Sequence, residues 1–161
     1  MKTSIYVFDT NTLSNIGRFY YESIFRSFWN LFETYVIDGQ IVSVRDVKKE
    51  IEKKEGIKDL PKRLEALNRS FFRNPNKEES VFITRMFQIP QFRNSIKQDK
   101  LLSNDPYADP FIIAKAQSLK GTVVTEEKHS PNSGKIPTIC EYYQICCINL
   151  EQFFSKENWT F

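Results

Sequence analysis

The sequence predicts an α/β fold in which a central, mainly parallel sheet lies between two layers of helices. Four short runs rich in β-branched and apolar residues, at 5–8, 40–42, 122–125 and 146–149, alternate with segments that have a helical spacing of apolar residues. Strands and helices that alternate in this way form parallel sheets covered on both faces. With 161 residues, 40% of them hydrophobic, the chain fits a single domain over 1–161.

In the first half of the chain, capping residues and glycines set the expected helix ends. Asp9 and the polar residues after it suit a helix start directly behind the first strand, and Gly17 is expected to end that helix. Ser43 is the expected N-cap of the helix after the second strand, and Gly56 follows its end. The expected elements are a strand over 5–8, a helix that starts near 9–12, a helix over 20–35, a strand over 40–42 and a helix over 43–54.

In the second half, prolines and glycines mark the boundaries. Pro61 and Pro110 stand in expected first turns of helices, where a proline removes no helical hydrogen bond, and Gly121 follows the end of a helix. The expected elements are helices over 60–72, 78–88, 107–119 and 136–143, a turn at 74–76, strands over 122–125 and 146–149, a polar loop over 126–135 and a final helical turn over 151–154.

The composition limits the classes of function. The formal net charge is +3 and the pI is near 8.7, which favours a polyanionic partner only weakly. No apolar run approaches the roughly 18 residues of a membrane span, and the run at 5–8 is too short for a signal peptide. Cys140, Cys146 and Cys147 are an odd set that makes a poor disulfide framework, so we expect buried, reduced cysteines in a cytoplasmic protein.

Acidic residues recur where strands are expected to end. In an open parallel sheet, the carboxyl ends of the strands form the ligand-binding edge. Each acid also has a structural interpretation, as a helix cap, a first-turn charge or part of a solvated face, so their shared position carries the argument. The acids at this edge are Asp9 after the first strand, Asp46 and Glu50 on the helix after the second, Asp105 and Asp109 near the start of the helix before the 122–125 strand, and Glu126 and Glu127 after that strand.

A cluster of carboxylates suits a hard divalent cation. Neighbouring carboxylates repel one another and raise each other's pKa, and a bound Mg²⁺ or Mn²⁺ removes that repulsion. Such a cation activates water and stabilises negative charge on a phosphate. His129 is the only histidine, so chemistry that needs a Ser–His or Cys–His pair would depend on one loop residue.

The motifs around these acids resemble those of the PIN-domain family over nearly the whole chain. The run 6–13 (YVFDTNTL) is similar to the family's first motif, an apolar strand followed by Asp-Thr-Asn. The run 43–50 (SVRDVKKE) is similar to the second, a helix that carries a metal-binding Glu. The resemblance therefore implies metal-binding roles for Asp9 and Glu50.

Two further motifs of this family lie in the second half. The run 108–116 (ADPFIIAKA) resembles the third motif, which implies that Asp109 is a metal ligand. The run 123–127 (VVTEE) resembles the fourth, but Glu127 stands where the family usually has Asp, and Glu126 is an alternative ligand. Together with a late Lys-Ile-Pro run, these features resemble a PIN-like subfamily of bacteria and archaea.

The resemblance implies a metal-dependent endoribonuclease of the VapC type, often the toxin of a toxin–antitoxin pair. Such proteins commonly form homodimers and are blocked by an antitoxin that enters the acidic groove. The implied catalytic and metal-binding acids are Asp9, Glu50, Asp109 and Glu127 or Glu126, which would hold one or two Mg²⁺ or Mn²⁺ ions and cut RNA to a 5′-phosphate and a 3′-hydroxyl. Residues expected to orient ligands or water are Asn11, Thr125 and Asp105, and those expected to contact RNA phosphates are Arg45, Lys48, Lys49 and Lys53.

Three other functions fit parts of the sequence. A phosphatase of the haloacid-dehalogenase type also begins with a strand and an Asp, but it needs a second acid two residues later, where this chain has Asn11. A PIN-like domain without activity, which binds RNA or protein, is compatible with Glu127 in the fourth motif. A structure-specific DNA nuclease is also related, but it would carry more acids and helical DNA-binding insertions.

Overall fold

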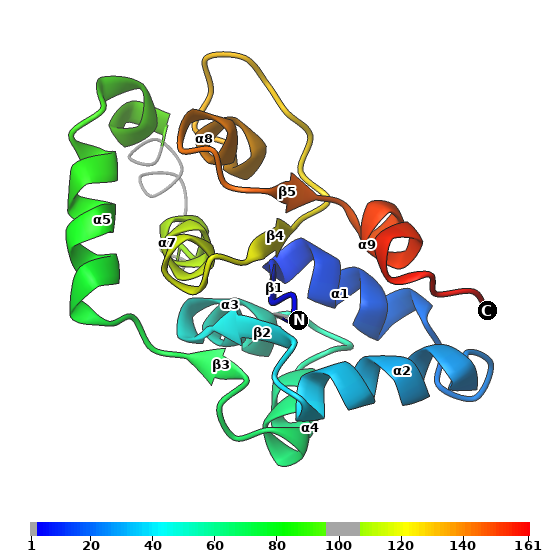
Figure 1. Cartoon of the computed structure of the whole chain (residues 1–161). Coiled ribbons are helices and arrows are strands. Elements are labelled where there is room, and N and C mark those ends of the chain that lie inside the picture. The colour runs from blue at the N-terminus through cyan, green and yellow to red at the C-terminus, as the bar shows by residue number, and fades with distance from the viewer. Residues whose placement is uncertain (1–2, 96–106) are drawn as a thin grey trace.

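The computed structural model describes residues 3–95 and 107–161 (Figure 1). Within this part of the chain, the sheet has five strands in the order β3-β2-β1-β4-β5, and each neighbouring pair is parallel. The carboxyl ends of all strands therefore lie at one edge of the sheet. The strands are β1 (Tyr6–Phe8), β2 (Ile41–Val44), β3 (Phe72–Arg73), β4 (Thr122–Val124) and β5 (Cys147–Ile148).

Helices cover both faces of the sheet (Figure 1). On one face, α7 contacts the three central strands β1, β2 and β4. On the other, the ring of Phe8 packs against Phe32 of α2 and Phe153 of α9. This confirms the predicted fold class, an α/β protein with a parallel sheet between two helical layers. The helices are α1 (Thr10–Phe19), α2 (Arg26–Ile37), α3 (Arg45–Glu52), α4 (Leu60–Leu67), α5 (Lys77–Phe87), α7 (Asp109–Leu119), α8 (Ile136–Tyr142) and α9 (Leu150–Glu157).

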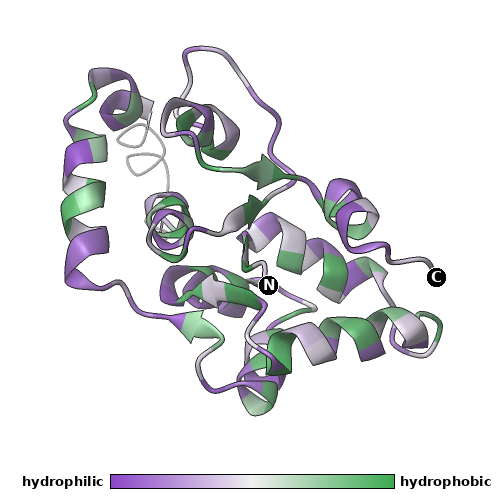
Figure 2. Cartoon of the chain, viewed as in Figure 1, coloured by the Kyte–Doolittle hydropathy of each residue, from purple (hydrophilic) through white to green (hydrophobic). Residues whose placement is uncertain are grey.

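The core forms because the central strands have no polar face. All three residues of β1 are fully buried, as expected for a parallel strand with helices on both sides. Figure 2 shows the hydrophobic residues of the strands at the centre of the molecule. Much of the aromatic content lies here: Tyr6 packs edge-on against Phe153, and Phe28 stacks on Phe32. Phe71 is also fully buried and packs edge-on against Phe72.

Two expected helix boundaries are wrong because tertiary packing overrides the local signals. Gly17 lies inside α1, where it brings the helix close to its neighbours, since an added Cβ would sit 3.0 Å from Ile57 Cγ2. The helix expected over 20–35 begins only at Arg26. The Tyr20 carbonyl instead accepts a hydrogen bond of 2.7 Å from the Trp29 indole, so the segment between them forms a turn that returns onto the core.

Two other expectations fail at the second strand and beside it. Ser43 lies in β2 rather than capping α3, and its hydroxyl donates to the carbonyl of Phe8 at 2.7 Å. The helix expected over 60–72 ends at Leu67, and Phe72 begins the short edge strand β3. A strand of two residues carries too little alternation to be recognised in the sequence.

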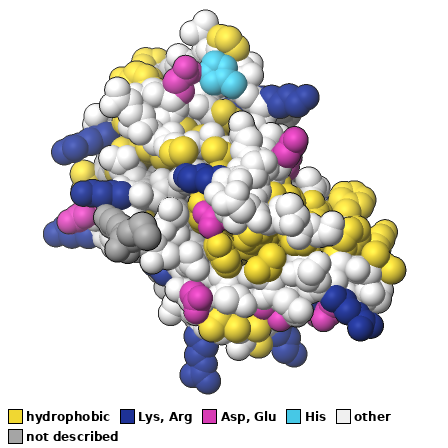
Figure 3. All heavy atoms as spheres, turned by 45° about the vertical axis from the view of Figure 1, so that its right-hand side comes forward, with side chains coloured by type: hydrophobic (Ala, Val, Ile, Leu, Met, Phe, Trp, Pro, Cys, Tyr) yellow, Lys and Arg dark blue, Asp and Glu magenta, His cyan; other side chains and the backbone are white. Residues whose placement is uncertain are grey.

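Several large hydrophobic side chains are exposed at the surface. Phe19, Tyr21, Ile24 and Phe161 are each more than half exposed, and Figure 3 shows hydrophobic side chains gathered on the side of the molecule that it brings forward.

Within residues 3–95 and 107–161, no helix combines the length and apolar character needed to span a membrane. The cysteines are free thiols; Cys140 is buried as expected, whereas Cys146 is exposed.

Candidate active site

The carboxyl ends of the three central strands bring the sequence-predicted acids to one edge. Asp9 directly follows β1, Thr125 directly follows β4, and α3 begins directly after β2. The strand order reverses direction between β1 and β4, because the chain first builds β2 and β3 on one side and later β4 and β5 on the other. Open α/β sheets bind ligands at such a reversal.

Asp9 is both a helix cap and a member of this cluster. Its side chain is only 3% exposed, and its two oxygens have different partners. Oδ1 accepts from the backbone N–H of Thr10 at 2.6 Å, which makes Asp9 the N-cap of α1. Oδ2 accepts from the Thr125 hydroxyl at 2.7 Å, which ties the end of β1 to the end of β4.

Glu50 is fixed from two sides. It lies on α3, and the Thr10 hydroxyl donates a hydrogen bond to its Oε2. The backbone N–H of Ala108, just before α7, donates to Oε1 at 3.0 Å. Thr10 therefore links the carboxylates of Asp9 and Glu50, through its backbone and its hydroxyl. The sequence analysis did not predict this supporting role of Thr10, although its position between Asp9 and Asn11 in the Asp-Thr-Asn run could have indicated it.

Asp109 and Glu127 complete the group. Asp109 is the first residue of α7, and Glu127 follows β4 by three residues. The negative charge of Glu127 raises the pKa of both Asp9 and Asp109, so the three carboxylates are close enough to repel one another. One oxygen of Glu127 accepts from the backbone N–H of Ile136 at the start of α8, at 2.9 Å.

Burial dominates the electrostatics of the cluster. It raises the pKa of Asp9 from 3.8 to about 7, against the hydrogen bond from Thr125, and the charges of Glu127 and Glu50 add to the rise. Burial also raises the pKa of Asp109 well above its usual value, and the charge of Asp9 contributes next. The pKa of Glu50 is raised by burial as well, although its hydrogen bonds from Thr10 and Ala108 oppose the shift.

Glu126 points away from the acids. Its Oε1 accepts from the backbone N–H of Leu150 at 2.8 Å, where it faces the N-terminus of α9. Its own backbone N–H donates to Asn11 Oδ1 at 3.0 Å. Of the two glutamates left open by the sequence, Glu127 is therefore the one beside Asp9 and Asp109.

Asn11 and Thr125 lie where the sequence suggested supporting residues. The Asn11 amide donates to the Thr125 hydroxyl at 3.3 Å, and its oxygen holds the backbone after β4. Asn11 is not a helix cap, because Asp9 fills that position. Asp105, the third expected supporting residue, lies outside the described residues.

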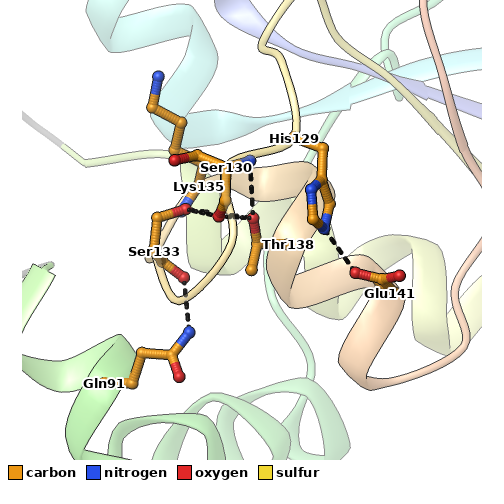
Figure 4. Close-up of polar contacts among 7 residues, drawn as sticks. All are labelled: Gln91, His129, Ser130, Ser133, Lys135, Thr138 and Glu141. Carbon is orange, nitrogen blue, oxygen red and sulfur yellow. Dashed lines mark hydrogen bonds and ion pairs between the residues drawn. The ribbon is translucent and has the colours of Figure 1, made fainter.

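The loop that carries Glu127 to α8 is held by a set of hydroxyl groups (Figure 4). Thr138 donates to the carbonyl of Ser130 at 2.7 Å, Ser133 donates to the same carbonyl at 2.6 Å, and Gln91 donates to the carbonyl of Ser133 at 3.1 Å. His129 pairs with Glu141 at 2.5 Å on the exposed side of this loop. The single histidine therefore has a partner away from the acidic cluster.

The basic residues near Glu50 in the sequence differ in exposure. Arg45, Lys49 and Lys53 are exposed, whereas Lys48 is half-buried. Lys48 forms an ion pair with Glu65 at 2.8 Å, which joins α3 to α4. The ion pair gives Lys48 a structural role beside the phosphate contact expected from the sequence.

The carboxylate oxygens of the four acids are suitable ligands for a hard divalent cation, although they do not converge on one point in this structure. In the part of the chain that the structure describes, no three acidic, histidine or cysteine side chains are arranged to hold a metal ion as they stand. The four acids nevertheless offer oxygen donors of the kind that Mg²⁺ and Mn²⁺ prefer. Burial and then the negative charges of neighbouring acids raise the pKa of Asp9 and of Asp109, and a cation would remove that repulsion.

The chain is similar to a chain in the crystal structure of VapBC2 from Rickettsia felis bound to a DNA fragment from their promoter. The two chains have a TM-score of 0.48 and 16% sequence identity, and the similarity covers 90% of this chain and 98% of the other. A similarity this weak gives no information on the activity or the partners of the present chain. No curated protein matches the sequence. The model of one family matches residues 6–161, and the chain therefore belongs to that family, which is described as a domain of unknown function (DUF4411).

Proposed function

We propose that the chain is a metal-dependent endoribonuclease whose catalytic residues are Asp9, Glu50, Asp109 and Glu127. The observation that carries this proposal is the burial of Asp9 among other acids, which raises its pKa to about 7. Buried like charges are unfavourable unless a cation neutralises them. The resemblance of four motifs to those of PIN domains supports the same assignment.

The residues of the cluster have separate tasks in this proposal. Asp9 and Asp109 would hold Mg²⁺ or Mn²⁺ through carboxylate oxygens, with Glu50 and Glu127 on either side of them. When bound, the cation would lower the pKa of a water molecule and stabilise negative charge on the scissile phosphate. Hydrolysis would leave a 5′-phosphate and a 3′-hydroxyl, as the PIN resemblance implies.

The hydrogen bonds of the cluster support this use of the acids. A carboxylate oxygen that accepts one hydrogen bond keeps a further lone pair for a cation. Thr125 holds Asp9 Oδ2 at 2.7 Å, and Thr10 and Ala108 hold the two oxygens of Glu50. These partners fix the direction of each carboxylate, in the way that residues behind metal ligands commonly do.

The substrate would be held outside the acids. Arg45 and Lys49 are exposed residues of α3, the helix that carries Glu50, and Lys53 is exposed directly after the end of this helix. Cations of this kind bind phosphate groups without reading the base sequence. RNA is the proposed substrate because the motif resemblance is to ribonucleases.

The biological setting proposed here follows the same resemblance. A cytoplasmic toxin of the VapC type would be blocked by an antitoxin that enters the acidic groove. A homodimer is the further expectation, and the exposed side chains of Phe19, Tyr21 and Ile24 offer apolar surface for an association of this sort.

A second candidate is a PIN-like domain that binds RNA or protein without cutting. The specific observation in its favour is that the described acids are not arranged to hold an ion as they stand. In addition, one oxygen of Glu127 is occupied by the backbone N–H of Ile136. The two candidates differ in their affinity for Mn²⁺, because an inactive domain has no need of a cation.

The test compares Asp9→Asn with Asp38→Asn, which makes the same chemical change at an exposed position. We expect the parent to cut a total RNA pool with Mg²⁺ or Mn²⁺ and to stop in EDTA. Cleavage by Asp9→Asn should fall by at least about 100-fold, or about 2.7 kcal/mol of transition-state stabilisation. Asp38→Asn should cut as well as the parent.

Two outcomes would reject the proposal. If Asp9→Asn cuts RNA as fast as the parent, the site is wrong. If the parent neither cuts RNA nor binds Mn²⁺ in calorimetry, the inactive binding domain is favoured. Duplex and branched DNA are included as substrates, so that a DNA nuclease would be recognised by its preference for them.

A further inference from the structure

Asp46 is a buried acid next to the proposed site that the mechanism does not use. It lies in the first turn of α3, four residues before Glu50, so the two side chains share one face of the helix. It is only 8% exposed, although it is an acidic residue near a helix end. Aspartate is rarely buried to this extent unless something pairs with it.

The carboxylate of Asp46 has an unsatisfied oxygen. Its Oδ2 is fully buried and accepts no hydrogen bond. Both oxygens of Glu50, by contrast, are occupied by Thr10 and Ala108. A buried polar atom without a partner is strongly unfavourable, and more so when the group is ionised.

No described side chain supplies the missing positive charge. Asp46 forms no ion pair with any described residue, and Lys48, two residues along α3, pairs with Glu65 instead. The neighbouring Arg45 is exposed. The negative charge of Asp46 acts on Glu50, whose pKa it raises, so the two carboxylates are close to one another.

We propose that Asp46 is an additional cation ligand of the acidic site, and that its buried oxygen shares one Mg²⁺ or Mn²⁺ with Glu50. This inference rests on the proposed function, because it extends the same metal site along α3. Among the described residues, Asp46 Oδ2 is the one buried carboxylate oxygen without a hydrogen bond, and a hard cation suits such an oxygen beside a second carboxylate. The site would then draw acids from two successive turns of α3, from the end of β1, from the start of α7 and from the loop after β4.

The first experiment measures Mn²⁺ affinity by calorimetry in the parent, in Asp46→Asn and in Glu52→Gln. Glu52 is the matched control, because it is an exposed acid on the same helix. We expect the dissociation constant for Mn²⁺ to rise by about tenfold or more in Asp46→Asn and to stay unchanged in Glu52→Gln. The melting-temperature increase produced by Mn²⁺ should be smaller in Asp46→Asn than in the parent.

A purely structural Asp46 predicts a different result. If Asp46 serves only as a negative charge at the start of α3, Asp46→Asn lowers the melting temperature equally in EDTA and in Mn²⁺. An unchanged Mn²⁺ affinity in Asp46→Asn would overturn this inference while leaving the proposed function in place. A parent chain that binds no Mn²⁺ would overturn both.

The second experiment separates direct ligation from an effect of charge at a distance. Asp46→Cys replaces an oxygen donor with a thiolate, which prefers a soft cation such as Cd²⁺. We expect the ratio of Cd²⁺ to Mn²⁺ affinity to rise by about tenfold relative to Asp46→Asn, which contains the same native cysteines. If Asp46→Cys and Asp46→Asn have the same ratio, Asp46 does not touch the cation and the inference fails.

Discussion

Charge is buried at two places along α7, and the protein treats the two places in opposite ways. In the C-terminal half of α7, Lys115 is only 5% exposed, and it pairs with Glu79 of α5, which is 2% exposed. The Nζ atom of Lys115 lies 2.8 Å from Oε1 of Glu79. The ammonium group also donates to the carbonyl of Asn74 at 2.9 Å. At the start of the same helix, Asp109 lies near other acids, and after burial the negative charges of Asp9 and Glu127 raise its pKa.

The difference separates a structural use of charge from a binding use. The Lys115–Glu79 pair contains its own counter-charge and needs nothing further, so it joins α5 to α7. The acidic cluster places like charges beside one another around the buried side chain of Asp9, where their repulsion is unfavourable. Repulsion between these acids lowers the free energy of unfolding, and residues kept at such a cost are expected to bind a ligand, here a cation.

The largest expected effect comes from breaking the matched pair. Lys115→Met should lower the free energy of unfolding by about 3–5 kcal/mol, because it leaves the Glu79 carboxylate buried without a partner. Urea unfolding followed by circular dichroism measures this loss. Lys62→Met, at an exposed position of α4, is the control and should change the free energy of unfolding by less than about 0.5 kcal/mol.

The double variant Lys115→Met with Glu79→Leu sharpens the interpretation. Replacing both partners by apolar groups removes the uncompensated charge, so most of the lost stability should return. If the double variant is no more stable than Lys115→Met, the single variant acts through altered packing, and the pair is not the structural unit described above.

The second effect lies in the acidic cluster and depends on pH. In the folded chain Asp9 keeps its proton up to a pKa of about 7, whereas its usual value is 3.8. Between these values the folded state binds a proton that the unfolded state releases, so the free energy of unfolding falls as pH rises. The slope from this one group is at most about 1.4 kcal/mol per pH unit.

Asp9→Asn should lack this slope. Urea unfolding in EDTA from about pH 4 to about pH 8 measures it, and the parent should lose stability relative to Asp9→Asn as pH rises. Adding Mn²⁺ at the high-pH end should restore the parent and have little effect on the variant. If the free energy of unfolding depends on pH in the same way in both proteins, the pKa of Asp9 is not raised, and the inferred repulsion between the acids is wrong.

The positions of the acids in the candidate site were most predictable where the topology of the sheet alone decides them. Asp9 and Glu50 follow neighbouring strands of a parallel sheet, so their approach needs no knowledge of side-chain packing. Asp109 was placed by the same logic, since α7 leads into β4. The helix that ends at Leu67 and the two-residue strand β3 were not predictable, because their boundaries depend on pairing with β2.

The choice between Glu126 and Glu127 shows what the sequence could not settle. Successive side chains point to opposite sides in extended backbone, so one of the two had to turn away from the acids. Which one does so depends on hydrogen bonds made far along the chain, by Leu150 to Glu126 and by Ile136 to Glu127. Neither contact leaves a signal near 126–127 in the sequence.

The smallest expected effect tests that assignment. Glu126→Gln keeps an acceptor for the Leu150 N–H but removes a negative charge at the start of α9, which should cost about 0.3–1 kcal/mol of the free energy of unfolding. RNA cleavage should be unchanged. Glu127→Gln, the matched variant one residue away, should instead reduce cleavage strongly without destabilising the metal-free chain, because it removes repulsion with Asp9 and Asp109. If Glu126→Gln abolishes cleavage and Glu127→Gln does not, the fourth acid is Glu126, and the loop must rearrange to bring it to the site.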